Sequence, residues 1–110
     1  MTTHIVTSHG ADFFGEDRHP LKAVGDLADY ARGAISYAES GPLLDLLREP
    51  GTDRTIPAAE AAQLSELLIR VSRSRDTKPR PSALARALAD AAGRAAADGE
   101  PWEWTVEAAR

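Results

Sequence analysis

Residues 102–107 read WEWTVE, and large apolar side chains alternate in this stretch with polar ones. Strict alternation is the pattern of a β-strand with one buried face, so Trp102, Trp104 and Val106 are expected to point into a core. At the other end of the chain, residues 4–7 read HIVT, which is β-branched and also favours a strand. We therefore predict a small antiparallel sheet in which the N- and C-terminal strands pair.

Between these strands the sequence has helical periodicity. Apolar residues recur at steps of three and four in residues 21–38, 57–71 and 82–98. Residues 42–48 predict a shorter helical segment, Thr55-Ile56 a very short strand, and Gly99 the end of the last helix. The predicted fold class is α+β: a small antiparallel sheet formed by the two terminal strands and covered on one face by three to four helices.

Length and composition predict one domain over residues 1–110. The chain has no cysteine, which excludes disulfides, thiolate metal sites and cysteine nucleophiles. Its N-terminus lacks the basic start and apolar run of a signal peptide, and no stretch is apolar enough to span a membrane. We expect a cytoplasmic protein with no membrane partner.

Residues 8–20, SHGADFFGEDRHP, contain two of the three histidines and both phenylalanines. We predict an ordered loop that folds back over the sheet and buries Phe13 or Phe14. One interpretation is structural, with Asp12 and Asp17 accepting hydrogen bonds from turn amides. The other is a metal site, because imidazole and carboxylate groups suit zinc-like or manganese-like ions. Its candidate ligands in the loop region 4–19 are His4, His9, Asp12, Asp17 and His19.

No catalytic residues are identified. Ser8 and His9 are adjacent, and neighbours on an extended chain point to opposite faces, so they form no nucleophile and base without a special turn. Glycine-rich phosphate-binding motifs are absent as well. An enzyme is therefore less favoured than a binding protein, and no cofactor is predicted.

A second candidate site is basic. Seven basic and two acidic residues lie between Arg70 and Arg94, whereas the whole chain has a net charge of −4. The proline-rich loop within residues 70–86 is a candidate anion-binding tip, although it is longer than the turn of a helix-turn-helix motif. The alternative is a solvated loop whose charges balance the acidic remainder. The candidate residues are Arg70, Arg73, Arg75, Lys78 and Arg80.

Three stretches together resemble a family of small, uncharacterised actinobacterial proteins. They are SHGADFFG at residues 8–15, IPAAEA at 56–61 and EPWEW at 100–104. The resemblance implies a stand-alone cytoplasmic domain, and it brings no known activity or catalytic residues.

These observations favour a non-enzymatic protein-binding or regulatory module, similar in character to immunity proteins, antitoxins and phage-defence factors. The partner is then expected to be another protein. One alternative is a small metal-binding domain or metal-dependent enzyme that uses the histidine-bearing loop. A second alternative is a nucleic-acid-associated protein that uses the basic loop.

Overall fold

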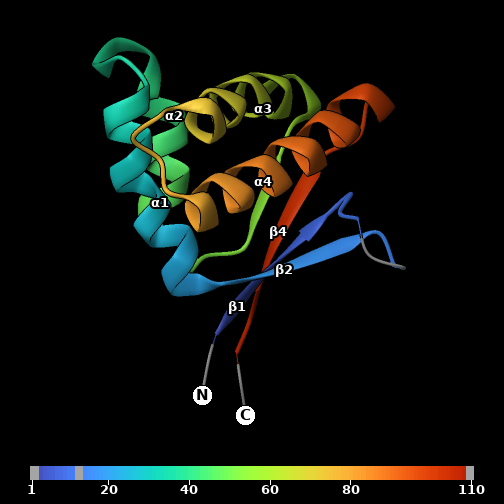
Figure 1. Ribbon diagram of the computed structural model, residues 1–110. Coiled ribbons are helices and arrows are strands. Elements are labelled where there is room, and N and C mark those ends of the chain that lie inside the picture. The colour runs from blue at the N-terminus through green and yellow to red at the C-terminus, as the bar shows by residue number, and fades with distance from the viewer. Residues whose placement is uncertain (1–2, 12–13, 109–110) are drawn as a thin grey trace.

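The computed structural model describes residues 3–11 and 14–108, which form four β-strands and four α-helices. In chain order these are β1 (His4–Ser8), β2 (Glu16–Pro20), α1 (Leu21–Ala34), α2 (Tyr37–Arg48), β3 (Arg54–Ile56), α3 (Ala58–Arg73), α4 (Pro79–Asp98) and β4 (Trp102–Glu107). The helices lie together on one side of the sheet (Figure 1). The fold is therefore α+β, as the sequence predicts.

The two ends of the chain pair in the middle of the sheet. The strand order is β2-β1-β4-β3, and all neighbouring strands are antiparallel. β1 lies against β4 with Thr7 opposite Trp104, and β3 lies on the other side of β4. This arrangement confirms the predicted sheet, and the short strand predicted at Thr55-Ile56 forms one of its edges.

The segment predicted as a loop over residues 8–20 is a β-hairpin. Residues 16–20 form β2, which pairs with β1 along its whole length. The Gly10 amide donates a hydrogen bond to the Gly15 carbonyl oxygen at 2.9 Å, and the Ala11 amide donates to Asp17 Oδ1 at 3.0 Å. The second bond confirms the predicted capping role of Asp17. At Gly10 a Cβ atom would collide with the backbone of residues 16–17, so this close turn requires glycine.

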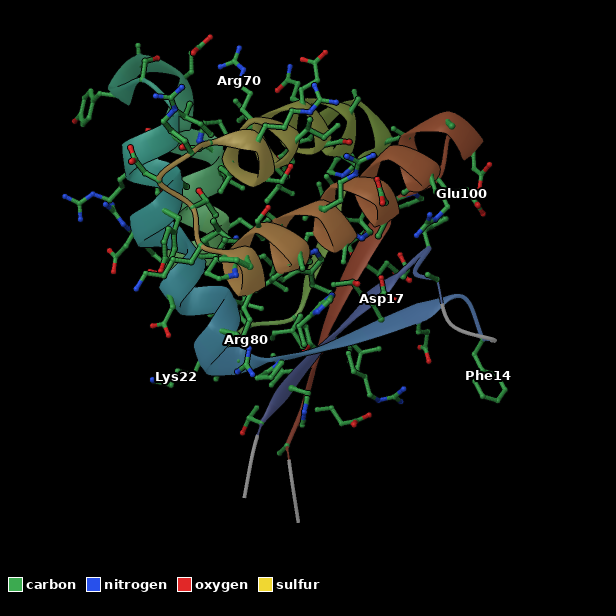
Figure 2. All side chains as sticks on the ribbon, in the orientation of Figure 1. Phe14, Asp17, Lys22, Arg70, Arg80 and Glu100 are labelled. Atoms are coloured by element: carbon green, nitrogen blue, oxygen red, sulfur yellow. The ribbon has the colours of Figure 1, made fainter. Side chains whose placement is uncertain are left out.

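In its described residues, 8–11 and 14–20, the hairpin does not fold back over the sheet. Phe14 lies at its tip, points away from the helices and is 79% exposed (Figure 2). Phe13 and Asp12 lie outside the described residues. The expectation that burial of a phenylalanine fixes this segment is therefore not supported at Phe14. Strand pairing with β1 and the turn hydrogen bonds hold the hairpin instead.

The first predicted helix is two helices. α1 ends at Ala34, the next two residues adopt extended backbone, and α2 continues through the Ser40-Gly41-Pro42 stretch where the helix was expected to stop. The signal for the new start is Ser36 followed three residues later by Glu39, the spacing of a capping box. In the structure the Ser36 hydroxyl donates to the Glu39 carboxylate at 3.0 Å and does not cap a backbone amide.

α3 and α4 run antiparallel, side by side, and are joined by residues 74–78 (Figure 1). This connection is shorter than predicted because α4 already begins at Pro79. Pro79 and Pro81 fall in the first turn, where backbone N–H groups have no helical acceptor, so neither proline removes a helical hydrogen bond. Ser82, the first residue of the helix predicted over residues 82–98, donates its hydroxyl to the Ser72 carbonyl oxygen.

The core lies between the sheet and the helices. Trp102 and Trp104 are 0% and 1% exposed, which confirms their predicted burial. Alanine makes up most of the buried face of α4, so its neighbours approach closely, and Ser65 Oγ on α3 donates to the Ala89 carbonyl oxygen at 2.8 Å. Across the described ranges, no helix is both long and apolar enough to cross a membrane.

Candidate functional site

The residues predicted as metal ligands are spread along the hairpin. His4 begins β1 and His9 follows its last residue, so about 16 Å of extended chain separates them. His19 lies on β2 opposite Ile5, near the His4 end. Asp12 lies outside the described residues. The described members of the set therefore do not gather at one point, because the segment forms strands and not a compact loop.

His19 faces the helices. Its strand partner Ile5 is fully buried, and side chains directly opposite each other in a sheet share a face. Burial lowers the pKa of the His19 imidazole below 6.5, and the negative charge of Asp17 opposes this shift. The buried Nε2 atom of His19 has no hydrogen-bond partner among the described residues. Strand alternation therefore turns this histidine toward the helices.

An open groove of about 450 Å³ adjoins His19 between α1 and the first turns of α4. Its walls are mostly apolar, and its polar members come from three different elements. The lining residues are His19, Pro20, Ala23, Asp26, Leu27, Tyr30, Arg80, Pro81, Ala83, Leu84 and Ala87. An apolar groove with few polar groups is the usual form of a ligand site.

The predicted anion-binding residues divide into two groups. Arg70 binds Glu39 at the start of α2, with Nη1 and Oε2 2.8 Å apart. Its hydrogen bond lowers the pKa of the Glu39 carboxyl and raises the pKa of the guanidinium. Arg70 therefore ties α3 to α2 and is not free for an external anion.

The remaining four cations lie at the end of α3, on the connection and at the start of α4; we call them the basic tip. They are Arg73, Arg75, Lys78 and Arg80. Within residues 3–11 and 14–108 none of them forms an ion pair. Figure 2 shows Arg80 extending from α4 toward the junction of β2 and α1, where it lines the groove.

A second cluster, the His9 corner, lies where the hairpin meets the turn between α4 and β4. It consists of Ser8, His9, Asp98 and Glu100. His9 Nε2 lies 3.1 Å from Glu100 Oε1, and Asp98 offers a third ligand atom within 4.8 Å of the other two. Asp98 and Glu100 are about ninety residues from His9 in the chain, so local sequence spacing gives no signal of this cluster.

Ser8 and His9 do bond to each other, contrary to expectation. Ser8 Oγ lies 2.8 Å from His9 Nδ1. The required turn is present, because His9 has φ 60°, a left-handed conformation uncommon for a residue with a Cβ atom. Ser8 Oγ also accepts the Glu103 amide at 2.9 Å and so extends the β1–β4 ladder. Ser8 thus orients the imidazole of His9 and adds one hydrogen bond between β1 and β4.

The geometry defines a small α+β domain with an apolar groove, a basic tip and a histidine-carboxylate corner. The chain belongs to the family described as a domain of unknown function (DUF7739), whose model matches residues 10–105. No curated protein and no solved structure matches the chain.

Proposed function

We propose that this domain is a non-enzymatic protein-binding module and that it binds an acidic segment of a partner protein. The observation that carries the proposal is the position of Arg80, which lines the apolar groove and also belongs to the basic tip. One partner segment is then able to bury an apolar side chain between α1 and α4 while its carboxylates face the cations. Buried apolar anchors ringed by polar contacts are typical of protein interfaces.

Charge supports an acidic partner. The four cations of the basic tip have no ion-pair partners among the described residues, so an incoming carboxylate displaces no internal one. α4 has neither an acidic residue in its first turn nor a side-chain cap, which leaves its positive dipole end uncompensated. Among its described lining residues the groove contains one carboxylate, Asp26. Its Oδ2 atom lies 3.8 Å from Lys22 Nζ, which partly offsets its negative charge.

The nucleic-acid alternative uses the same cations. Single strands, however, gain much of their affinity from bases stacked on aromatic rings. Tyr30 is the only aromatic residue besides His19 among the described lining residues, and the remaining walls are mostly aliphatic or proline. This surface favours an apolar side chain over a base. A cytoplasmic location and an actinobacterial origin are expectations of the sequence that belong to the same proposal.

The test uses NMR titration of the full-length chain with defined probes. The main probe is a synthetic peptide with one leucine flanked by glutamates and aspartates. Two further peptides replace the leucine by serine or the acidic residues by lysine, and a single-stranded DNA oligonucleotide tests the alternative. We expect the acidic leucine peptide to shift groove and tip resonances, with an affinity that falls as salt rises.

A charge-reversed variant, Lys78→Glu with Arg80→Glu, is expected to weaken that binding at least about tenfold. The matched control reverses Arg32 and Arg48, which are exposed on α1 and α2 away from the groove. It is expected to change the affinity less than twofold or so, since neither residue lines the groove. A peptide affinity that does not change when the leucine is replaced, or when Lys78 and Arg80 are reversed, would contradict the proposal. DNA binding lost in the charge-reversed variant, with no peptide binding, would support the nucleic-acid alternative instead.

A further inference from the structure

At the His9 corner an imidazole and two carboxylates converge from segments far apart in the chain. The ligand atoms of His9, Asp98 and Glu100 all lie within 4.8 Å of one another. His9 is half-buried, whereas the two acidic residues are exposed. The corner lies at the opposite end of α4 from the basic tip, as the label of Glu100 in Figure 2 indicates. Any ligand here is therefore independent of the groove.

Two residues with left-handed backbone conformation bring the three ligand side chains together. Gly99 has φ 68° and ends α4, so that Asp98 and Glu100 flank the turn. His9 has φ 60° and turns its ring toward them. Glycine adopts this conformation freely, but histidine does so rarely, and such residues concentrate at functional sites. The backbone of His9 is held there by Arg94, whose Nε donates to the His9 carbonyl oxygen at 2.7 Å.

The charges at the His9 corner favour binding of a cation. Asp98 and Glu100 lie at the C-terminal end of α4, where the helix dipole is negative and carboxylates are unfavourable. Helices usually balance this end with lysine or arginine, yet the last turn of α4 contains no basic residue, and Arg94 one turn earlier bonds the His9 carbonyl oxygen. The imidazole of His9 is the group that faces Glu100. A bound divalent cation would offset both carboxylates and the dipole together.

The imidazole is already oriented as a metal ligand. Its Nδ1 atom bonds Ser8 Oγ at 2.8 Å, and Ser8 Oγ is fixed in turn by the Glu103 amide. Metal-binding histidines commonly use one ring nitrogen for the metal while the other donates to a supporting group. With Nδ1 held by Ser8, Nε2 is the ring nitrogen that faces Glu100 and is left to bind a metal.

We propose that His9, Asp98 and Glu100 bind one divalent transition metal ion of the zinc or manganese type, with Ser8 as a positioning residue. Imidazole with carboxylates suits these ions better than Ca²⁺ or Mg²⁺, which prefer oxygen alone. The separation of 3.1 Å between His9 Nε2 and Glu100 Oε1 fits two ligands of one ion, since bonds of about 2.0–2.2 Å put neighbouring ligands about 3 Å apart. Asp98 is the third ligand, with its ligand atom within 4.8 Å of the other two.

The test is calorimetric titration of the untagged full-length chain with Zn²⁺, together with line broadening by Mn²⁺ in NMR spectra. We expect one Zn²⁺ per chain and Mn²⁺ broadening centred on residues 8–10 and 98–101. The variant Asp98→Asn with Glu100→Gln removes two ligand charges with little change in shape. We expect it to abolish measurable Zn²⁺ binding. Ser8→Ala is expected to weaken binding about 10–100-fold, as loss of a supporting group does.

The matched control is His4→Gln with Glu107→Gln, a histidine and a carboxylate opposite each other at the far end of β1. It is expected to leave the Zn²⁺ affinity unchanged. Amide NMR spectra of each variant show whether the fold is retained. No Zn²⁺ binding by the wild type, or an affinity that the Asp98 and Glu100 substitutions leave intact, overturns the proposal. The first result would leave the corner as an internal contact between His9 and Glu100, and the second would mean that Zn²⁺ binds at other residues.

Discussion

The edge of one indole ring meets the face of the other at Trp102 and Trp104. Their ring centroids lie 5.3 Å apart and their planes make an angle of 83°. Edge-to-face pairs of this kind are favoured because the positive edge of one ring meets the negative face of the other. The two residues are two apart on β4, so strand alternation puts both on the buried face. The pair is thus part of the core and not an exposed platform for a ligand.

Replacement of Trp104 by alanine is expected to lower the free energy of unfolding by about 3–5 kcal/mol, because it removes a fully buried ring and leaves a cavity. Chemical denaturation measures the change. Tyr37→Ala is the control, since Tyr37 is 96% exposed and its loss is expected to have little effect. Equal stability of the Trp104 variant and the wild type would contradict burial of the ring.

A chain that ends at Gly99 is expected to be unfolded. The truncation removes β4, which lies between β1 and β3 and contributes both tryptophans. A chain that ends at Ala108 keeps the whole of β4 and serves as the control. Circular dichroism during heating distinguishes them: we expect a cooperative transition in the control only. Native-like unfolding of the shorter chain would mean that β1 folds without its central neighbour.

The sequence predicts the elements whose side-chain pattern is local. β4 alternates strictly, and Gly99 adopts the left-handed conformation expected of a helix end. β2 was missed because the sequence EDRHP has no apolar alternation. Its strand geometry comes from pairing with β1, a tertiary contact that outweighs local propensity. The apolar periodicity of residues 21–38 continues across the break at Ser36, so periodicity alone does not reveal that one helix ends and another begins.

In the candidate sites, too, local features are visible in the sequence and tertiary contacts are not. The basic tip and Arg70 are close in the chain and are visible in the sequence. The ion pair of Arg70 is not visible there, because its partner Glu39 lies on a different helix. Likewise the loop histidines were visible, but their surroundings depend on strand pairing. The pairing of β1 with β4 brings His9 beside Glu100, and the pairing of β1 with β2 turns His19 toward the helices.

Thr7→Val is expected to raise the free energy of unfolding by about 1 kcal/mol. The Thr7 side chain is fully buried and its hydroxyl has no hydrogen-bond partner among the described residues. A buried hydroxyl without a partner costs free energy, and valine has nearly the same shape. Ser65→Ala is the contrasting variant, since its hydroxyl donates to the Ala89 carbonyl oxygen. Its loss is expected to cost about 1 kcal/mol. Chemical denaturation of both variants measures the change in the free energy of unfolding, which is expected to be positive for Thr7→Val and negative for Ser65→Ala. Destabilisation by both substitutions would contradict the unpaired state of the Thr7 hydroxyl.

His19 is expected to make the domain less stable in mild acid. Burial lowers the pKa of His19 in the folded chain below its ordinary value of 6.5. As the pH falls, the unfolded chain therefore binds a proton at this residue before the folded chain does. Protonation then favours unfolding. The stability contributed by neutral His19 is complete above pH 6.5 and is lost as the pH falls from there through the lowered pKa.

Removal of the imidazole tests this assignment. His19→Leu retains a side chain of similar size and has no titrating group, so its stability is expected to fall less steeply below pH 6.5 than that of the wild type. Denaturant unfolding measured at several pH values gives the two slopes. The carboxyl groups titrate in both proteins, so their contribution is removed when one slope is subtracted from the other. His4→Gln is the matched control, because it removes a histidine from the outer face of the sheet and leaves His19 in place. It is expected to keep the wild-type slope. Parallel slopes for the wild type and His19→Leu would mean that His19 titrates alike in the folded and unfolded chain, and hence that its ring is not held among the helices.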